Sequence, residues 1–174
     1  MLRGELVGLR ARLPADVPVL EAELQDDVVT MTRSYGRPWW PVSPGTEASR
    51  YRITEPDDKR APFSVVELAT DTLAGIAVLN DIDTHHRSAH VGVLLRPAFR
   101  GKGLGTDVVR VLCHYGFTVL GLHRLAMDTL ADNHAMIAAA ERAGFRREGV
   151  LREDSWTLGS FVDRVEFARL AGDP

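Results

Sequence analysis

Cysteine is almost absent from this chain of 174 residues. The single one, Cys113, excludes an intrachain disulfide, which is compatible with a reducing cytoplasm. No apolar run reaches membrane-spanning length, and the N-terminal MLRGELVGLR lacks the apolar region of a signal peptide. A formal net charge of −3 gives no broad attraction to nucleic acid or to an anionic membrane. We therefore expect a cytoplasmic protein that uses neither as a partner.

Several motifs of catalysis and nucleotide binding are missing as well. The P-loop pattern GxxxxGK[ST], the GxSxG pattern and a Ser-His-Asp arrangement do not occur. His85, His86 and His90 lie close together in sequence, but no cysteine or carboxylate completes a metal-ligand set at the usual spacing. We expect no metal site, a solvated hairpin tip at the first two histidines, and no catalytic role for Cys113.

The composition that remains is that of an ordinary globular protein. It is 45% hydrophobic and 26% charged, and its length suits one domain with a core of its own. There is no internal repeat and no low-complexity tract. We expect a single domain over residues 1–174.

The most informative stretch is 91–120, VGVLLRPAFRGKGLGTDVVRVLCHYGFTVL. Its first five residues form an apolar run that predicts a buried strand, and Pro97 cannot continue a central ladder. Apolar side chains then recur at 104, 108, 111, 112, 115 and 119, a spacing that predicts one face of a helix. Gly121 is a suitable C-terminal stop.

The join between that strand and that helix has the features of a phosphate site. A helix start carries free backbone N–H groups and partial positive charge. Glycine lets the backbone approach a ligand closely, and Arg100 and Lys102 add full charges. The alternative is a tight turn with solvated cations. A Rossmann site fits poorly, because the third glycine comes one residue early and no acidic residue follows about twenty positions on.

Three segments together resemble a known superfamily. The hexapeptide Arg100-Gly-Lys-Gly-Leu-Gly105 resembles the Gln/Arg-x-x-Gly-x-Gly/Ala signature of the GNAT N-acetyltransferases. Asn133-His-Ala, followed by Gly144-Phe145, resembles the segment after the fifth strand of that superfamily. The run from Arg147 to Arg152 resembles the RimJ/RimL-like branch, whose members acetylate protein N-termini and small amines. The resemblance implies acetyl-CoA as cofactor, a protein N-terminus or small molecule as the amine acceptor, and allows a homodimer.

The resemblance also assigns binding residues. It places the pyrophosphate on the glycine loop and the pantetheine arm along the preceding strand, through backbone groups. The cofactor-binding residues it implies are Val93, Leu94, Leu95, Arg100, Gly101, Lys102, Gly103, Leu104, Gly105, Thr106 and Asn133. For the strand residues, a place in the core is equally compatible. Asn133 is also a suitable helix N-cap, and both roles fit one amide side chain.

Catalysis by such a protein needs a base, because an amine with a pKa near 10 is neutral only about one part in a thousand at pH 7. The resemblance points to Asp128, and His90 is the second candidate because imidazole titrates in the useful range. The usual tyrosine and serine positions hold Ala140 and Met136. No matched residue is left for the acid role, and Glu153, Asp154 and Ser155 are only nearby candidates. The alternative is a non-catalytic acyl-CoA-binding module.

Two tryptophans are candidates for binding the amine acceptor. Trp39 and Trp40 fall in the region that borders the acceptor cleft in the superfamily, so they are candidate substrate-binding residues. Tryptophan is more often buried by packing, and we favour packing for these two and for Trp156.

The remaining pattern predicts the fold. We expect strands at 6–13, 63–69, 73–82, 88–95, 124–130, 145–153 and 161–170, and helices at 14–25, 46–54, 104–119 and 133–143. This order implies a mixed α/β fold with a mostly antiparallel sheet of about seven strands and about four flanking helices. The GNAT topology has the same order.

Overall fold

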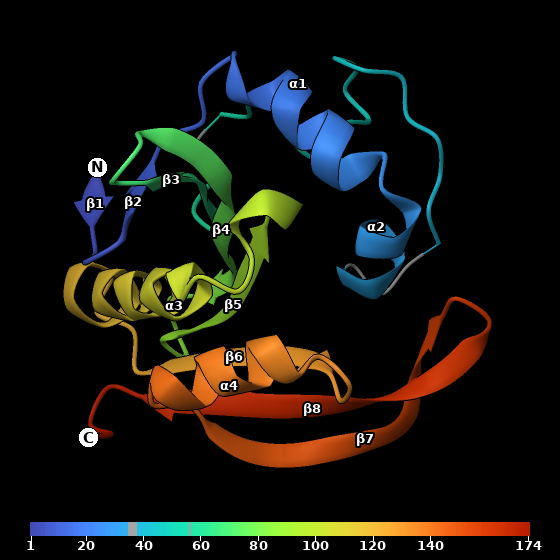
Figure 1. Ribbon diagram of the computed structural model, residues 1–174. Helices are drawn as coiled ribbons and strands as arrows, with labels where there is room; N and C mark the ends of the chain where they lie inside the picture. Colours follow the sequence, from blue (N-terminus) through green and yellow to red (C-terminus); the bar gives the residue numbers. More distant parts are fainter. Residues whose placement is uncertain (35–37, 56) are drawn as a thin grey trace.

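The computed structural model describes residues 1–34, 38–55 and 57–174. Eight strands form one sheet in the order β1-β2-β3-β4-β5-β6-β8-β7 (Figure 1). Neighbouring strands are antiparallel except β5 and β6, which are parallel. The strands are β1 (Leu2–Arg3), β2 (Val7–Arg10), β3 (Ala61–Glu67), β4 (Thr72–Asp83), β5 (Ser88–Leu95), β6 (Arg124–Leu130), β7 (Arg146–Thr157) and β8 (Ser160–Leu170). The expected mixed, mostly antiparallel fold is confirmed.

In the described part of the chain, four α-helices flank the sheet. They are α1 (Asp16–Leu20), α2 (Val28–Ser34), α3 (Leu104–His114) and α4 (His134–Arg142). The π-helical turns η1 (Glu21–Gln25) and η3 (Tyr115–Val119) extend α1 and α3, and a 3-10 turn, η2 (Pro97–Phe99), follows β5. No helix in the described residues is long and apolar enough to cross a membrane.

The helices divide between the two faces of the sheet. Buried residues of α3 and α4 share the main core with Val91, Leu125 and Met127. On the other face, Leu20 and Leu24 of α1 and η1 pack with residues of β4 in a smaller cluster. Because side chains alternate along a strand, the neighbours of the main-core residues on β5 and β6 point toward the α1 side. That face carries the candidate catalytic residues.

The sequence pattern of α3 follows from this packing. Five of the six predicted apolar positions, 104, 108, 111, 112 and 115, are buried or packed against the core. The sixth, Val119, is exposed, because the chain turns off the sheet at the end of η3. Gly121 then takes a φ of 66°, as a helix stop requires.

One expectation about the N-terminal half is wrong. Residues 46–54 form single turns rather than a helix, because Ser43 accepts hydrogen bonds from Thr46 and Tyr51 is drawn into the smaller cluster. Helix α2 lies in a stretch for which the sequence pattern predicts no element. The short edge strand β1 was not predicted either, and with it the sheet of the described residues has eight strands.

A partly buried ion pair ties β2 to α1. Both guanidinium nitrogens of Arg10 contact the Asp16 carboxylate, at 2.6 and 2.8 Å. Leu13 N–H and the Ser64 hydroxyl donate to the same carboxylate. Burial alone would raise the pKa of Asp16, but these hydrogen bonds and the charge of Arg10 lower it to about 2.

Replacing Asp16 with Asn should therefore destabilise the fold in a pH-dependent way. The folded pKa lies below the ordinary value, so the carboxylate contributes fully above about pH 4 and loses its contribution as the pH falls toward 2. We expect a loss of about 2–3 kcal/mol at pH 7, measured by urea unfolding. The gap to wild type should narrow below pH 4. Asp58→Asn, at an exposed position, is the control; an equal loss there would contradict the assignment.

Candidate active site

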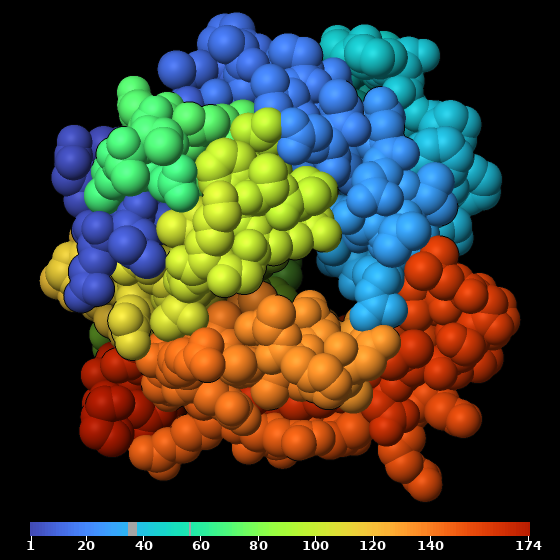
Figure 2. Space-filling view, in the orientation of Figure 1, coloured from blue at the N-terminus to red at the C-terminus, as the bar shows by residue number. Residues whose placement is uncertain are grey.

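The site begins where β5 and β6 separate. Their parallel pairing covers only Ser88–His90 against Arg124–Ala126. Beyond this point β5 continues to Leu95 and β6 to Leu130 without pairing to each other, so the facing edges of the two strands are left open. Figure 2 shows a hollow in the surface between β5, α2 and the β6–α4 region. An extended ligand could lie between these edges and use their backbone groups.

Both candidate bases lie at the point of separation. His90 Nε2 is 2.7 Å from Asp128 Oδ1, so the structure joins two residues that the sequence offered as separate candidates. Each side chain keeps about a third of its surface exposed, 36% and 32% respectively. The hydrogen bond with His90 lowers the pKa of Asp128 against the opposing effect of burial, and the charge of Arg164 adds to the lowering. The pair is therefore an imidazole backed by an ionised carboxylate.

Arg164 on β8 completes this group, and it carries no local sequence signal. Its Nη1 is 3.6 Å from Asp128 Oδ2, and its Nε is 2.9 Å from Asp154 Oδ2. Only the register of β8 against β6, in which Asp128 lies opposite Glu166, brings Arg164 within reach of Asp128. Asp154 was named from the sequence as a nearby candidate acid, but here it is the partner of an arginine.

The glycine loop has the geometry expected of it. Gly101 and Gly103 have φ angles of 74° and 80°, and α3 begins directly after them. Within the described residues, none of the backbone N–H groups of 101–106 donates a hydrogen bond. A Cβ at Gly101 would meet nothing within 4 Å, and one at Gly103 would meet only Leu6, at 3.8 Å. The loop is thus an open surface of free donors, which fits a diphosphate.

The two cations of the loop point in different directions. Arg100 donates to the Leu95 carbonyl at 2.9 Å and to the Thr30 hydroxyl at 3.2 Å, so it links the loop to β5 and α2. Lys102 is exposed, with its ammonium 5.2 Å from the centre of the Phe99 ring. Lys102 is thus open to an arriving anion, whereas Arg100, although also exposed, is held by β5 and α2.

A buried carboxylate holds the first turn of α3 in place. Asp107 accepts backbone hydrogen bonds from Glu5, Leu6 and Val7, at 3.2, 2.7 and 3.0 Å. It is only 5% exposed, and a Cβ on Gly4 would lie 2.4 Å from its Oδ2. This contact fixes the start of β2 against the glycine loop.

Asp107→Asn should destabilise the protein by about 2–3 kcal/mol. Both oxygens of the carboxylate accept backbone N–H groups, and in asparagine one of these oxygens is replaced by an NH2 group that would face an N–H donor. Thermal unfolding followed by circular dichroism measures the loss. Gly4→Ala should act in the same direction through the steric conflict, whereas Gly172→Ala has open space and should be neutral. A neutral Gly4→Ala would show that the contact is looser than described.

Asn133 has the capping role that we left open. Its side chain accepts from Met136 N–H at 3.3 Å and donates to Thr129 Oγ1 at 3.0 Å. The residue is exposed, so the second amide hydrogen remains available for a ligand. Ala140 is buried in the core and Met136 is packed against it, so neither position supplies an acid.

The tryptophans are only partly as expected. Trp39 is partly buried and donates to the Gln25 carbonyl at 2.9 Å. The prediction that Trp40 and Trp156 are buried by packing is wrong, because these side chains are 68% and 61% exposed. Trp156 lies on the long β7–β8 hairpin, where its ring packs against that of Phe161 with 5.0 Å between centres.

The remaining polar candidates are accounted for. Burial raises the pKa of the Cys113 thiol to about 11, which leaves it unreactive at neutral pH. His86 lies beside Asp83 at the exposed hairpin tip, 2.9 Å from it. In the portion of the chain that the structure describes, no group of three His, Cys, Asp or Glu side chains could hold a metal ion.

Comparison with known proteins decides the family. The sequence profile described as "Acetyltransferase (GNAT) domain" matches residues 7–146. The chain belongs to the GNAT acetyltransferase family. A relative named "Probable N-acetyltransferase YjcK", from Bacillus subtilis, is 31% identical over 73% of this chain and 74% of its own.

Two further matches concern polyamine acetylation. Spermidine N(1)-acetyltransferase of Vibrio cholerae is 32% identical over 57% of this chain, and the match likewise spans 57% of that enzyme. A crystal structure of spermidine N-acetyltransferase from Vibrio cholerae, in complex with CoA and spermine, has a TM-score of 0.85 and 24% identity, over 97% of both chains. At that identity the structural match establishes a shared GNAT fold.

Proposed function

We propose that this GNAT protein transfers the acetyl group of acetyl-CoA directly to an amine. The observation that carries the proposal is the His90–Asp128 pair at the point where β5 and β6 separate, on the sheet face away from α3. A module that only binds acyl-CoA needs the glycine loop and the open strand edges. It does not need an imidazole held by a carboxylate at the point where the two strands separate.

The residues divide the work as follows. Acetyl-CoA supplies an activated acetyl group as a thioester. The free N–H groups of 101–106, with Lys102, hold its diphosphate, and the open edge of Val93–Leu95 holds the pantetheine arm. A backbone N–H of β5 faces the developing oxyanion. The second amide hydrogen of Asn133 is a further donor to the arm.

His90 serves as the base for the acceptor. The amine nitrogen forms a bond to the carbonyl carbon, the carbon–sulfur bond breaks, and CoA leaves as the thiolate. The proton that the amine loses passes to His90, whose imidazolium is stabilised by Asp128. A thiolate with a pKa near 8 to 9 leaves without a strong acid, so the alanine at position 140 is compatible with turnover.

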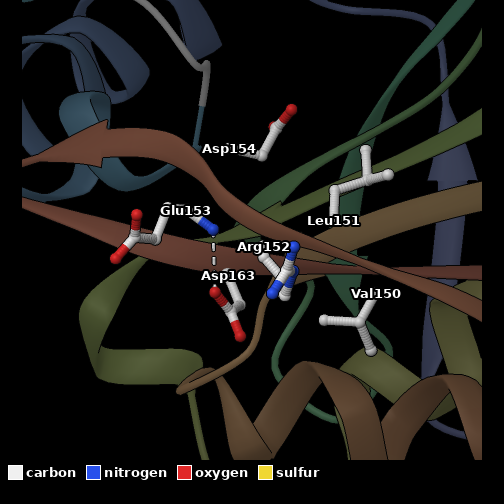
Figure 3. A pocket seen from close by; sticks show the side chains of 6 residues that line it. All are labelled: Val150, Leu151, Arg152, Glu153, Asp154 and Asp163. Carbon is white, nitrogen blue, oxygen red and sulfur yellow. Dashed lines mark hydrogen bonds between the residues drawn. The ribbon is translucent and has the colours of Figure 1, made fainter.

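We propose a polyamine of the spermidine type as the acceptor. Two matched proteins are named for this activity. Carboxylates also lie near the base and on the hairpin that follows: Glu166 lies opposite Asp128 on β8, and Glu153 and Asp163 line a hollow formed by β7 and β8 (Figure 3). The second candidate is a protein N-terminal α-amine, favoured by the RimJ/RimL-like run Arg147–Arg152.

An acceptor panel tests the proposal. The purified protein is mixed with acetyl-CoA and spermidine, spermine, a peptide with a free N-terminus, or the same peptide with a blocked N-terminus. Free thiol and the mass of the acetylated product are measured. We expect polyamine-dependent thiol release. Release only with the free peptide would favour the RimJ/RimL-like function, and CoA binding without amine-dependent release would favour a non-catalytic module.

A further inference from the structure

The contacts around His90 continue past Asp128 in an unbroken series. Asp128 Oδ1 lies by His90, Asp128 Oδ2 lies by Arg164 Nη1, and Arg164 Nε lies by Asp154 Oδ2. One residue from each of the strands β5, β6, β8 and β7 therefore contributes to one charged row. The last contact is an ion pair without an aligned hydrogen bond.

We propose that Arg164, anchored by Asp154, is a positioning residue that holds Asp128 against His90 and so leaves His90 Nδ1 as the atom that accepts the proton of the acceptor. This inference rests on the proposed acetyl transfer. It assigns Arg164 no contact with the substrates, since its effect passes through Asp128.

The choice of Nδ1 follows from the contacts. Nε2 is the nitrogen beside Asp128, so it carries the hydrogen in the neutral imidazole. Nδ1 makes no hydrogen bond with any described residue and keeps its lone pair. Protonation at Nδ1 gives an imidazolium whose Nε2–H still points at Asp128.

The need for an arginine follows from Asp128 itself. A carboxylate held at one oxygen can rotate about its χ2 bond, whereas a second cation on the other oxygen fixes its plane. The guanidinium is a planar fork, and Arg164 turns one nitrogen to Asp128 and another to Asp154. Asp154 in turn keeps this cation from swinging into solvent.

Other charged groups near the pair do not replace this arrangement. Glu166 lies directly across from Asp128 on β8 and adds negative charge. On β4, Asn80 lies across from His90 and accepts a hydrogen bond from Arg60. Among the described residues, Asp128 therefore has two ion-pair contacts, His90 and Arg164.

The first test follows the titration of His90 by imidazole NMR in the full chain without substrate, with His90→Gln used to assign the signal. Removing the positive charge should favour the imidazolium, so Arg164→Gln should shift the His90 midpoint to higher pH by roughly half a unit or more. Arg152→Gln removes an exposed arginine of the same hairpin and should shift it little. An unchanged midpoint in folded Arg164→Gln, or an equal shift in Arg152→Gln, would overturn the inference.

The second test uses turnover. Arg164→Gln should lower kcat about tenfold with unchanged CoA affinity, and should move the acidic limb of the kcat profile to higher pH. Arg164→Lys restores the charge without the planar fork, so the acidic limb of the kcat profile should return to its wild-type pH while kcat itself stays reduced. Adding Asp154→Asn to Arg164→Gln should not lower kcat any further, because Asp154 acts through Arg164. Full additivity of the two losses would contradict that order.

The two tests separate this inference from the proposed function. If no amine is acetylated by the wild-type protein, the function fails while the NMR titration still reports on Arg164. If acetylation is present but Arg164→Gln leaves both the titration and the pH profile unchanged, the function stands and the role of Arg164 is rejected.

Discussion

His90→Gln should lower kcat for amine acetylation by about 100-fold or more at pH 7, with the affinity for CoA unchanged. The glutamine keeps a polar side chain of similar reach beside Asp128 but has no group that can take a proton at this pH. Asp128→Asn should cost less, about tenfold, because it leaves the imidazole in place and removes only its partner. Steady-state kinetics and calorimetry with CoA measure the two effects separately.

The pH dependence gives this prediction its sharpest form. Without a base, the reaction depends on the fraction of acceptor that is already neutral, which grows tenfold for each pH unit below the amine pKa. The rate of His90→Gln should therefore rise steadily with pH and approach that of wild type near pH 10. If the rate of His90→Gln stays below that of wild type by the same factor at every pH, proton removal takes place elsewhere.

His134→Gln is the matched control. This exposed histidine begins α4, and replacing it leaves the β5–β6 junction intact. Its kcat should stay within about twofold of wild type, a change that corresponds to less than 0.5 kcal/mol in the barrier. An equal loss in both histidine variants would show that the assay reports stability rather than proton transfer.

Local patterns predicted the parts of this fold that depend on local physics. The bounds 88–95 and 124–130 agree with β5 and β6 to the residue. The first of these segments holds the apolar run 91–95, which stops just before Pro97, a residue that cannot continue a central ladder. The glycine loop and the start of α3 followed from backbone chemistry in the same way. The failure at 46–54 has the opposite cause, since burial of Tyr51 determines that segment.

The candidate site shows the same limit more sharply. His90 and Asp128 could each be named from the sequence, but their contact depends on the parallel pairing of β5 with β6. Arg164 could not be named at all, because its role depends on the register of β8. Arg100 matched the family signature, yet its bonds to Leu95 and Thr30 come from the way α2 approaches the loop. Long-range register, absent from any local window, is what assembles this site.

Gly103→Asp should weaken CoA binding by about 100-fold, equivalent to about 2.7 kcal/mol. Gly103 precedes the first residue of α3, with a φ of 80° and open space around it. An aspartate there would direct a negative charge at the surface where the free N–H groups meet the diphosphate. Calorimetry with CoA measures the change, and circular dichroism confirms that the variant is folded.

Gly121→Asp isolates the electrostatic part of this effect. Gly121 also has a positive φ, 66°, and nothing within 4 Å of a built Cβ, so aspartate meets a similar backbone strain there. It ends the helix that Gly103 begins, and its variant should bind CoA like wild type. S-acetylpantetheine, which lacks the diphosphate, should be used equally well as an acetyl donor by Gly103→Asp and wild type. If Gly103→Asp impairs that donor as strongly as acetyl-CoA, or if CoA affinity survives the substitution, the diphosphate does not lie at the start of α3.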